Sequence, residues 1–420
     1  MIANLTTPLI GIVSTSAIGR LGEPARLGGV AMASVIFDCL FWLFAFLRMG
    51  TTAFTAQSIG AGEAGEVRAH LARALVVAAL IGAGLILLQI PLAAIMLDAM
   101  GGSASVTTAA KSYFAIRIWS APLALGNYVV LGWLIGQARA ILALSVQIVI
   151  NLVNMAITVL LVPVLGFGIA GAAIAALAAE ATGFVVGLLI ARHLMRGSLF
   201  VSPTVLFDRP KLIRMLAVNR DIMIRTAALI TAFLFFTAQG ARSGDVTLAA
   251  NSVLNNFLLV SAFFLDGLAN AAEQLCGQAY GARDRAAFSG ATRLVVFWGF
   301  VFALVVATIF SLFGKNFIDI MTTSDDVRRL ARDFLIFAIA SPLLAVFAFA
   351  FDGVYIGATW ARDMRNLMVA SLLIFLSSWW ALRGFANAGL WGALLAFYAA
   401  RGGLEAARYP ALIRASFTKQ

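Results

Sequence analysis

Long apolar stretches are the feature that most constrains how this chain can fold. The stretch from Leu75 to Leu97 is almost entirely apolar, and about 20 such residues in a helix cross the roughly 30 Å of hydrocarbon in a bilayer. Of the 420 residues, 62% are hydrophobic and 12% are charged, whereas soluble domains carry about 25% charged residues. A transmembrane β-barrel would instead show short segments of alternating hydrophobicity. The sequence therefore predicts an all-α integral membrane protein.

Charged and glycine-rich breaks divide the chain into about twelve predicted transmembrane helices. They cover approximately residues 1–19, 28–57, 71–97, 109–135, 140–163, 167–191, 216–240, 247–277, 287–313, 330–357, 366–384 and 387–409. The first predicted span, 1–19, is shorter than its counterpart in the second half, 216–240. We therefore expect either an abbreviated first helix or a translation start upstream of Met1.

The second half of the chain repeats motifs of the first half at a nearly constant offset. Gly168-Ile-Ala-Gly171 recurs as Gly389-Leu-Trp-Gly392, and QSIGA at 57–61 recurs as QAYGA at 278–282. An even number of spans per half returns the chain to its starting side, so the halves are predicted to be parallel repeats, as in many secondary transporters. We predict two pseudo-symmetric six-helix lobes, residues 1–192 and 216–420, joined by a cytoplasmic linker at 193–215 and working by alternating access.

The distribution of the cations predicts the orientation. The formal net charge is +11, and most Lys and Arg fall on the inner side if the N-terminus is cytoplasmic, which the positive-inside rule favours. We assign Arg225 and Arg401 to the inner side, Arg117 to the outer side, and Arg48 alone to the interior of a span. Both termini are thus expected in the cytoplasm, the protein in the inner (plasma) membrane, and nucleic acid is not an expected partner.

Acidic residues inside predicted spans are costly and are candidates for function. Asp38, Glu180, Asp266 and Asp352 are candidate ion-coupling residues. Asp38 is ten residues from Arg48 along one helix, about 15 Å of rise, so it needs a partner on another span or a proton.

Two further groups of residues are candidates for a cavity wall or for helix motion. Asp266, Asn270 and Glu273 share one helical face, where Glu273 either acts in conformational change or simply holds Arg283 or Arg285. A second polar stripe either lines a substrate cavity or joins helices by hydrogen bonds; its members are Gln147, Asn151, Asn154 and Thr158.

Arg48 and two prolines complete the candidate set. Arg48 either faces the cavity or forms a buried ion pair. Pro122 and Pro342 stand at matched positions of the two halves and are expected to kink their helices, either as part of lobe bending or as tolerated structural residues. No pair of a nucleophile and a base and no metal-ligand spacing appears, so neither catalysis nor a cofactor is expected.

At these motifs the chain resembles the multidrug and toxic compound extrusion (MATE) family, specifically its DinF-like branch. The matching segments are FWLFAFLRMGTTAFTAQSIGAG (41–62), NLVN (151–154), GFGIAGAAIAALAAE (166–180), residues 235–285 and FDGVYIGATWARDMRN (351–366). The resemblance implies two six-helix lobes, a central cavity, and export of amphipathic, often cationic, small molecules driven by H⁺ or Na⁺.

Two positions depart from the pattern of proton-coupled relatives. Proton-coupled relatives, which this chain resembles, carry aspartates at the two positions that are occupied here by Ser14 and Thr158. Our hypothesis is that coupling has moved to Asp38 or Glu180, or relies on Asp266 and Asp352. Two alternatives remain open. A flippase of lipid-linked precursors would need a strongly cationic cavity, and a non-transporting membrane scaffold would fit the missing acids.

Overall fold

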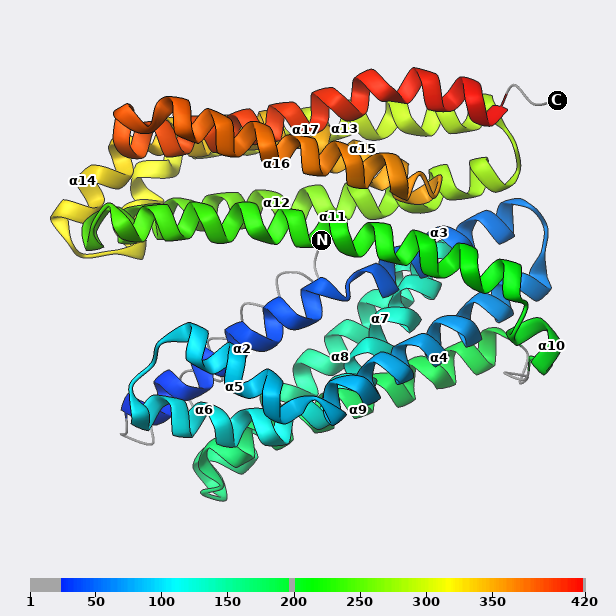
Figure 1. Cartoon of the computed structure of the whole chain (residues 1–420), viewed down its shortest axis with the longest axis horizontal. Helices are drawn as coiled ribbons and strands as arrows, with labels where there is room; N and C mark the ends of the chain where they lie inside the picture. Colours follow the sequence, from blue (N-terminus) through cyan, green and yellow to red (C-terminus); the bar gives the residue numbers. More distant parts are fainter. Residues whose placement is uncertain (1–23, 196–200, 418–420) are drawn as a thin grey trace. The chain divides into compact units, whose positions relative to one another are not determined.

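The computed structural model describes residues 24–195 and 201–417, and within these ranges the regular structure is helical, without strands (Figure 1). The predicted span at 1–19, with Ser14, lies outside the described residues. The helices of the first half are α2 (Pro24–Leu43), α3 (Phe46–Gly60), α4 (Ala64–Leu87), α5 (Gln89–Met100), α6 (Ala104–Arg117), η1 (Ile118–Ser120), α7 (Ala121–Gly136), α8 (Ala140–Val159), η2 (Leu160–Val164) and α9 (Gly168–Leu194). Those that follow are α10 (Pro203–Leu206), α11 (Arg209–Arg242), α12 (Asp245–Gly281), α13 (Arg285–Met321), α14 (Asp325–Asp333), α15 (Leu335–Gly357), α16 (Ala361–Leu382), η3 (Arg383–Phe385) and α17 (Ala386–Phe417).

Ten helical segments in the described part of the chain are long and apolar enough to cross a membrane. The last of them, Ala361–Phe417, contains two separate helices, α16 and α17. The chain is therefore a multi-pass, all-α membrane protein with a helix count close to the predicted twelve. One predicted span, 71–97, is wrong in its bounds. The helix ends at Leu87 and a new helix begins at Gln89, because Pro91 has no N–H to bond the carbonyl four residues earlier.

The described residues form two compact units. Unit 1 comprises the residues up to Thr55 and Glu63–Met215, and unit 2 comprises Ala56–Gly62 and the residues from Leu216 onward. The helix α3 thus begins in unit 1, while its last turn belongs to unit 2. Residues 201–215, which were predicted as part of a linker, belong to unit 1.

In unit 1 small residues let helices approach closely. The pairs α2 with α6, α8 with α9, and α4 with α7 make the main contacts. Gly132 of α7 lies directly on α3, since a Cβ there would come within 2.3 Å of the Arg48 carbonyl oxygen. The Thr52 hydroxyl donates hydrogen bonds to the carbonyls of Arg48 (2.9 Å) and Gly132 (3.1 Å). Hydroxyls at such contacts bond backbone carbonyls that lipid cannot satisfy.

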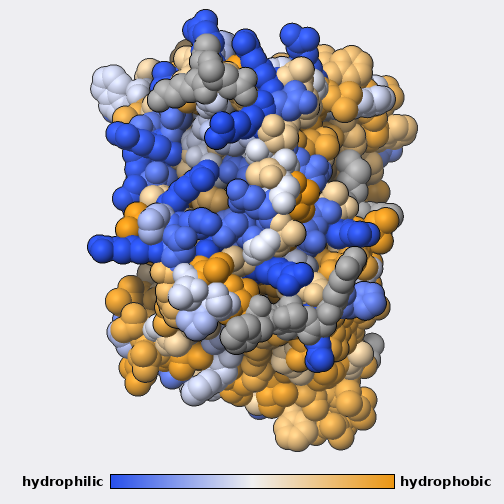
Figure 2. Space-filling view, turned by 90° about the vertical axis from the view of Figure 1, so that its right-hand side faces the viewer, coloured by the Kyte–Doolittle hydropathy of each residue, from blue (hydrophilic) through white to orange (hydrophobic). Residues whose placement is uncertain are grey.

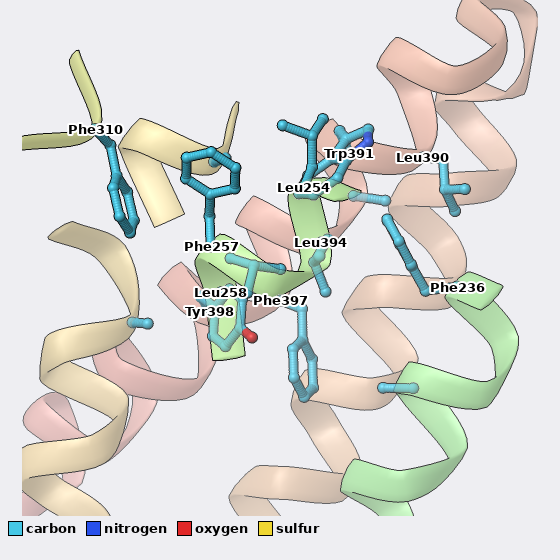
Figure 3. Close-up of a cluster of buried hydrophobic side chains, with 14 of the residues drawn as sticks. Phe236, Leu254, Phe257, Leu258, Phe310, Leu390, Trp391, Leu394, Phe397 and Tyr398 are labelled. Atoms are coloured by element: carbon cyan, nitrogen blue, oxygen red, sulfur yellow. The ribbon is translucent and has the colours of Figure 1, made fainter. Parts of the chain in front are cut away.

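In unit 2 a large aromatic core holds α11, α12, α15, α16 and α17 together. Phe236 of α11, Phe257 of α12 and Trp391 of α17 belong to this buried cluster (Figure 3). Trp391 packs edge-on against Phe236 at 5.1 Å between ring centroids, and its indole N–H donates to Asn251 at 2.8 Å. A buried Trp needs such a partner for its N–H, so this hydrogen bond fixes the orientation of the Trp391 ring within the cluster.

The repeated QSIGA and QAYGA motifs meet each other within unit 2. A Cβ on Gly60 would lie 1.9 Å from the Gln278 carbonyl oxygen, and a Cβ on Gly281 would lie 1.9 Å from the Gln57 carbonyl oxygen. The contact is reciprocal, as expected for equivalent segments related by an approximate two-fold axis. Only glycine fits at either position, which explains why both copies of the motif carry it.

Residues around α10 are held against α4 by a buried arginine. The Arg73 guanidinium is 1% exposed and donates to the carbonyls of Leu206 (3.2 Å) and Val205 (2.5 Å). It also pairs with Glu66 at 3.0 Å, and Lys211 pairs with the other oxygen of Glu66 at 2.7 Å. These bonds attach the start of α11 and α10 to unit 1.

Candidate functional site

The most deeply buried charged cluster in unit 2 is centred on Asp352 of α15. This side chain is 4% exposed. Its Oδ2 accepts hydrogen bonds from Arg225 of α11 and Arg401 of α17. The three residues come from three helices, and all lie in segments long and apolar enough to span a membrane. The predicted coupling residue Asp352 is thus an ion-pair partner shared by two guanidinium groups.

A second carboxylate completes this cluster. Glu405 follows Arg401 by one turn of α17, is 0% exposed, and neither of its carboxylate oxygens has a hydrogen-bond partner among the described residues. Its charge acts on Arg401, as does the charge of the exposed Asp266 on α12. The two arginines are therefore under the influence of three acids, so this cluster carries no excess of positive charge.

The sequence analysis did not single out Arg225 and Arg401 as buried charges. Both were assigned to the inner side, which stays a prediction, and Arg48 alone to the interior of a span. The structure places Arg225 and Arg401 in the middle of α11 and α17, where they are 4% and 2% exposed. Their partner Asp352 is remote in the chain, so its proximity was not visible. The i, i+4 spacing of Arg401 and Glu405 within one apolar helix was visible and would have indicated a paired, buried arginine.

A smaller polar cluster lies in unit 1 around Glu180 of α9. The amide of Asn127, on α7, donates to the Glu180 carboxylate at 2.7 Å and to its backbone carbonyl at 2.9 Å. Glu180 is half-buried. The charge of Arg117 acts both on Glu180 and on Asp38 of α2. The structure thus brings the two predicted acids of this half near one arginine.

Arg117 was not identified from sequence, where it was assigned to the outer side. It is half-buried at the end of α6, within the membrane-length segment Ala104–Gly136. Its guanidinium donates to the Tyr113 hydroxyl at 2.6 Å and lies over the rings of Phe37 (5.1 Å) and Tyr113 (5.6 Å). Aromatic faces stabilise a cation that has left water. Asp38 itself is exposed, so it can meet solvent or a ligand.

The predicted polar stripe lies along α8 and begins with a bond inside the helix. Gln147 donates to the Asn151 side chain at 3.3 Å. Asn151 and Thr158 are buried, whereas Gln147 and Asn154 are half-buried. The partly accessible members are available to a ligand, and the buried ones face neighbouring helices. A role of the stripe in substrate binding stays a prediction.

The other predicted residues are spread over both units. Arg48 is half-buried on α3, and Glu273 is 1% exposed on α12, close to the Gly357 of α15. Asn270 is half-buried on the same helix. The roles predicted for these residues remain predictions.

The two prolines do not occupy equivalent places. Pro122 lies in the first turn of α7, directly after the short η1 helix, whereas Pro342 lies inside the continuous helix α15. A proline in the first turn of a helix lacks only an N–H that would have no partner within the helix, whereas a proline inside a helix removes a hydrogen bond. Their role in conformational change stays a prediction.

The described residues contain no group of three or more His, Cys, Asp or Glu side chains that could hold a metal ion. Asp352 instead pairs with two arginines, and Glu180 accepts a hydrogen bond from the Asn127 amide. Such carboxylates can exchange a proton or bind a weakly held monovalent cation, and both changes alter the charge that faces the neighbouring arginine.

Comparisons with known proteins agree on the kind of molecule. The MatE family model matches residues 1–160 and 209–378, one stretch in each half. The chain is 37% identical over 404 residues to the DNA damage-inducible protein F of Escherichia coli, covering 95% of this chain and 87% of that protein. It is 27% identical over 405 residues to a probable multidrug resistance protein NorM of Caulobacter vibrioides, covering 90% and 82%.

Solved structures show the same fold. A multidrug resistance MATE family transporter of the MOP superfamily, in an outward-facing conformation, matches with a TM-score of 0.88 at 18% identity, covering 100% of this chain and 94% of the other. A MOP superfamily transporter from Pyrococcus furiosus matches with a TM-score of 0.87 at 19% identity, with the same coverage.

Proposed function

Because the chain belongs to the MatE family of multidrug efflux transporters, we propose that it is an antiporter that exports amphipathic, often cationic, small molecules in exchange for H⁺ or Na⁺. The domains we propose are an N-lobe at 1–192, a linker at 193–215 and a C-lobe at 216–420. Export proceeds by alternating access between the lobes. The protein lies in the inner membrane with both termini in the cytoplasm, as the distribution of its cations favours.

One observation carries this proposal. Each unit holds acids and arginines inside membrane-length helices: the charges of Asp38 and Glu180 act on Arg117, and Asp352 forms ion pairs with Arg225 and Arg401. Charged side chains at membrane depth are costly and mark ion pathways. A carboxylate whose partner is an arginine changes the local charge when it binds a proton or a cation, and the two charge states favour different helix arrangements.

The available energy is sufficient for such a shift. One charge moving through about 100 mV releases about 2.3 kcal/mol. A ligand can shift a conformational equilibrium by at most its differential affinity for the two states. The energy of one proton or sodium ion therefore changes the ratio of outward to inward states about fiftyfold.

The arginines also bear on the flippase alternative. That function would need a cationic cavity for pyrophosphate or sugar acids. The buried or half-buried arginines Arg117, Arg225 and Arg401 are more numerous than the sequence indicated, but each faces carboxylates. These clusters thus carry no excess of positive charge, which favours ion coupling over anion binding.

The test is export of a dye cation from proteoliposomes under an imposed H⁺ gradient or an imposed Na⁺ gradient, applied separately. We expect one gradient to drive export and dissipation of that gradient to stop it. If neither gradient moves the dye while a DinF-like transporter in the same vesicles exports it, the antiporter proposal is wrong and a scaffold role is favoured.

A further inference from the structure

A groove of about 770 Å³ lies in unit 2, lined by residues of α13, α15 and α17. It does not involve the charged cluster around Asp352. One end carries three arginines, Arg285 and Arg293 of α13 and Arg414 of α17. The remainder is lined largely by aromatic side chains, including Phe297, Phe300 and Phe347.

The chemistry of the groove changes along α13. Arg285, Ser289 and Arg293 follow at intervals of four residues and are continued on the same face by Phe297 and Phe300. From Arg285 to Phe300 the helix rises about 22 Å. The groove therefore passes from a cationic end to an apolar end over about the depth of one leaflet with its headgroups.

The arginines of the groove differ from those of the buried clusters. Arg285, Arg293 and Arg414 are exposed, and within 24–195 and 201–417 none forms an ion pair with a carboxylate. By contrast, Arg408 on the same α17 pairs with Asp363 at 2.9 Å. Three guanidinium groups without a carboxylate partner thus line the groove, and such groups are the donors that bind a phosphate.

The apolar half of the groove opens on a surface that suits lipid. Phe297 is 59% exposed and Phe347 37% exposed, and the neighbouring Trp298 is 54% exposed. Large apolar side chains on the outside of a membrane-spanning helix face acyl chains. The face of the molecule drawn in Figure 2 carries hydrophilic residues over much of its middle and hydrophobic residues along its edges.

We propose that this groove binds an anionic phospholipid of the cytoplasmic leaflet, with its phosphate among Arg285, Arg293 and Arg414 and one acyl chain along Phe297, Phe300 and Phe347. The leaflet assignment rests on the proposed orientation with cytoplasmic termini. A free phosphate would leave the aromatic half empty. A zwitterionic lipid would bring its own positive charge to the arginine end.

The test is lipid titration of the purified full chain in a mild detergent, with binding followed by native mass spectrometry. The probes are dioleoyl phosphatidylglycerol, dioleoyl phosphatidylcholine and the soluble headgroup glycerophosphoglycerol. The variants are the triple change Arg285→Gln, Arg293→Gln, Arg414→Gln and the single change Val296→Trp, which fills the groove and leaves the arginines. The matched control replaces three exposed arginines that do not line the groove, Arg68, Arg209 and Arg362, by Gln.

We expect the first phosphatidylglycerol to bind roughly tenfold more tightly than phosphatidylcholine, since each basic residue near an anionic lipid adds attraction. The triple variant loses this preference, the control retains it, and Val296→Trp weakens binding of both lipids. The proposal is overturned if the triple variant keeps the preference, if the control loses it equally, or if Val296→Trp binds as the wild type does. It is also overturned if glycerophosphoglycerol competes as well as the intact lipid.

Discussion

The buried ion pairs of Asp352 make unit 2 sensitive to the loss of either arginine partner. Both guanidinium groups and the carboxylate are at most 5% exposed. Removing one member of a buried ion pair leaves an uncompensated charge and typically costs about 3–5 kcal/mol. We therefore expect Arg401→Gln to lower the free energy of unfolding by about that amount, measured by thermal melting in detergent.

The exposed pair Arg408–Asp363 of the same unit provides the matched control. Its side chains are 50% and 29% exposed, and water and salt screen such pairs, so their removal costs at most about 1 kcal/mol. We expect Arg408→Gln to melt close to the wild type. Equal melting of both variants would show that the cluster around Asp352 does not depend on its charges.

In unit 1, neutralising either of the two acids near Arg117 is expected to abolish ion coupling without unfolding the protein. Glu180→Gln keeps an acceptor for the Asn127 amide, which donates at 2.7 Å in the wild type, but removes the charge. Asp38→Asn likewise removes a negative charge, here from an exposed side chain. Transport by each variant is measured in proteoliposomes, and melting is the check on folding.

If both acids carry the coupling ion, each variant should stay folded and lose gradient-driven export. An intact export rate in Asp38→Asn would remove Asp38 from the mechanism. The same result in Glu180→Gln would remove Glu180.

At the scale of helices, glycine sets the distance between α12 and α15. A Cβ on Gly353 would lie 2.4 Å from the carbonyl oxygen of Ala269, so Gly353→Ala must push the two helices apart. Overpacking of this kind typically costs about 1–3 kcal/mol. We expect a clear loss of thermal stability in Gly353→Ala.

The same substitution elsewhere in unit 2 separates crowding from helix propensity. Nothing lies within 4 Å of a Cβ placed on Gly403 of α17. Alanine is the better helix former by about 0.5–1 kcal/mol, so Gly403→Ala should be neutral or mildly stabilising. A stability loss of similar size at both positions would contradict the close approach of α12 and α15.

The attachment of α10 to α4 depends on one side chain. Arg73 donates to the carbonyls of Val205 and Leu206, and the following Phe207 is exposed. Arg73→Gln should release this segment, because these hydrogen bonds are lost. Cleavage by a protease requires local opening, so limited digestion with chymotrypsin should cut after Phe207 several-fold faster than in the wild type. Arg68→Gln, an exposed change on the same helix, should not alter the rate.

For the whole molecule, the sequence predicted the architecture well because a membrane leaves the backbone few options. Every span must satisfy its own peptide groups as a helix, so apolar length alone indicated most of the helices. The break at Leu88 was missed because a single proline ended a helix inside an apolar run.

The composition of the charged clusters was predicted less completely. The acids were identified because a carboxylate in an apolar segment is conspicuous, but Arg117, Arg225 and Arg401 were assigned only to the outer or the inner side. Asp352 is 49 residues from Arg401 in the chain, and only packing of separate helices brings them together. Pairing between helices cannot be deduced from local periodicity.

The central claim is that substrate and ion move in opposite directions through one protein. The most direct measurement loads proteoliposomes with indicators for H⁺ and for Na⁺ and then imposes a gradient of the dye cation alone. The account predicts that dye movement drives one of the two ions the opposite way, and that Asp38→Asn or Glu180→Gln abolishes this ion movement. Dye movement in the wild type without any movement of H⁺ or Na⁺ would contradict antiport and show a facilitator.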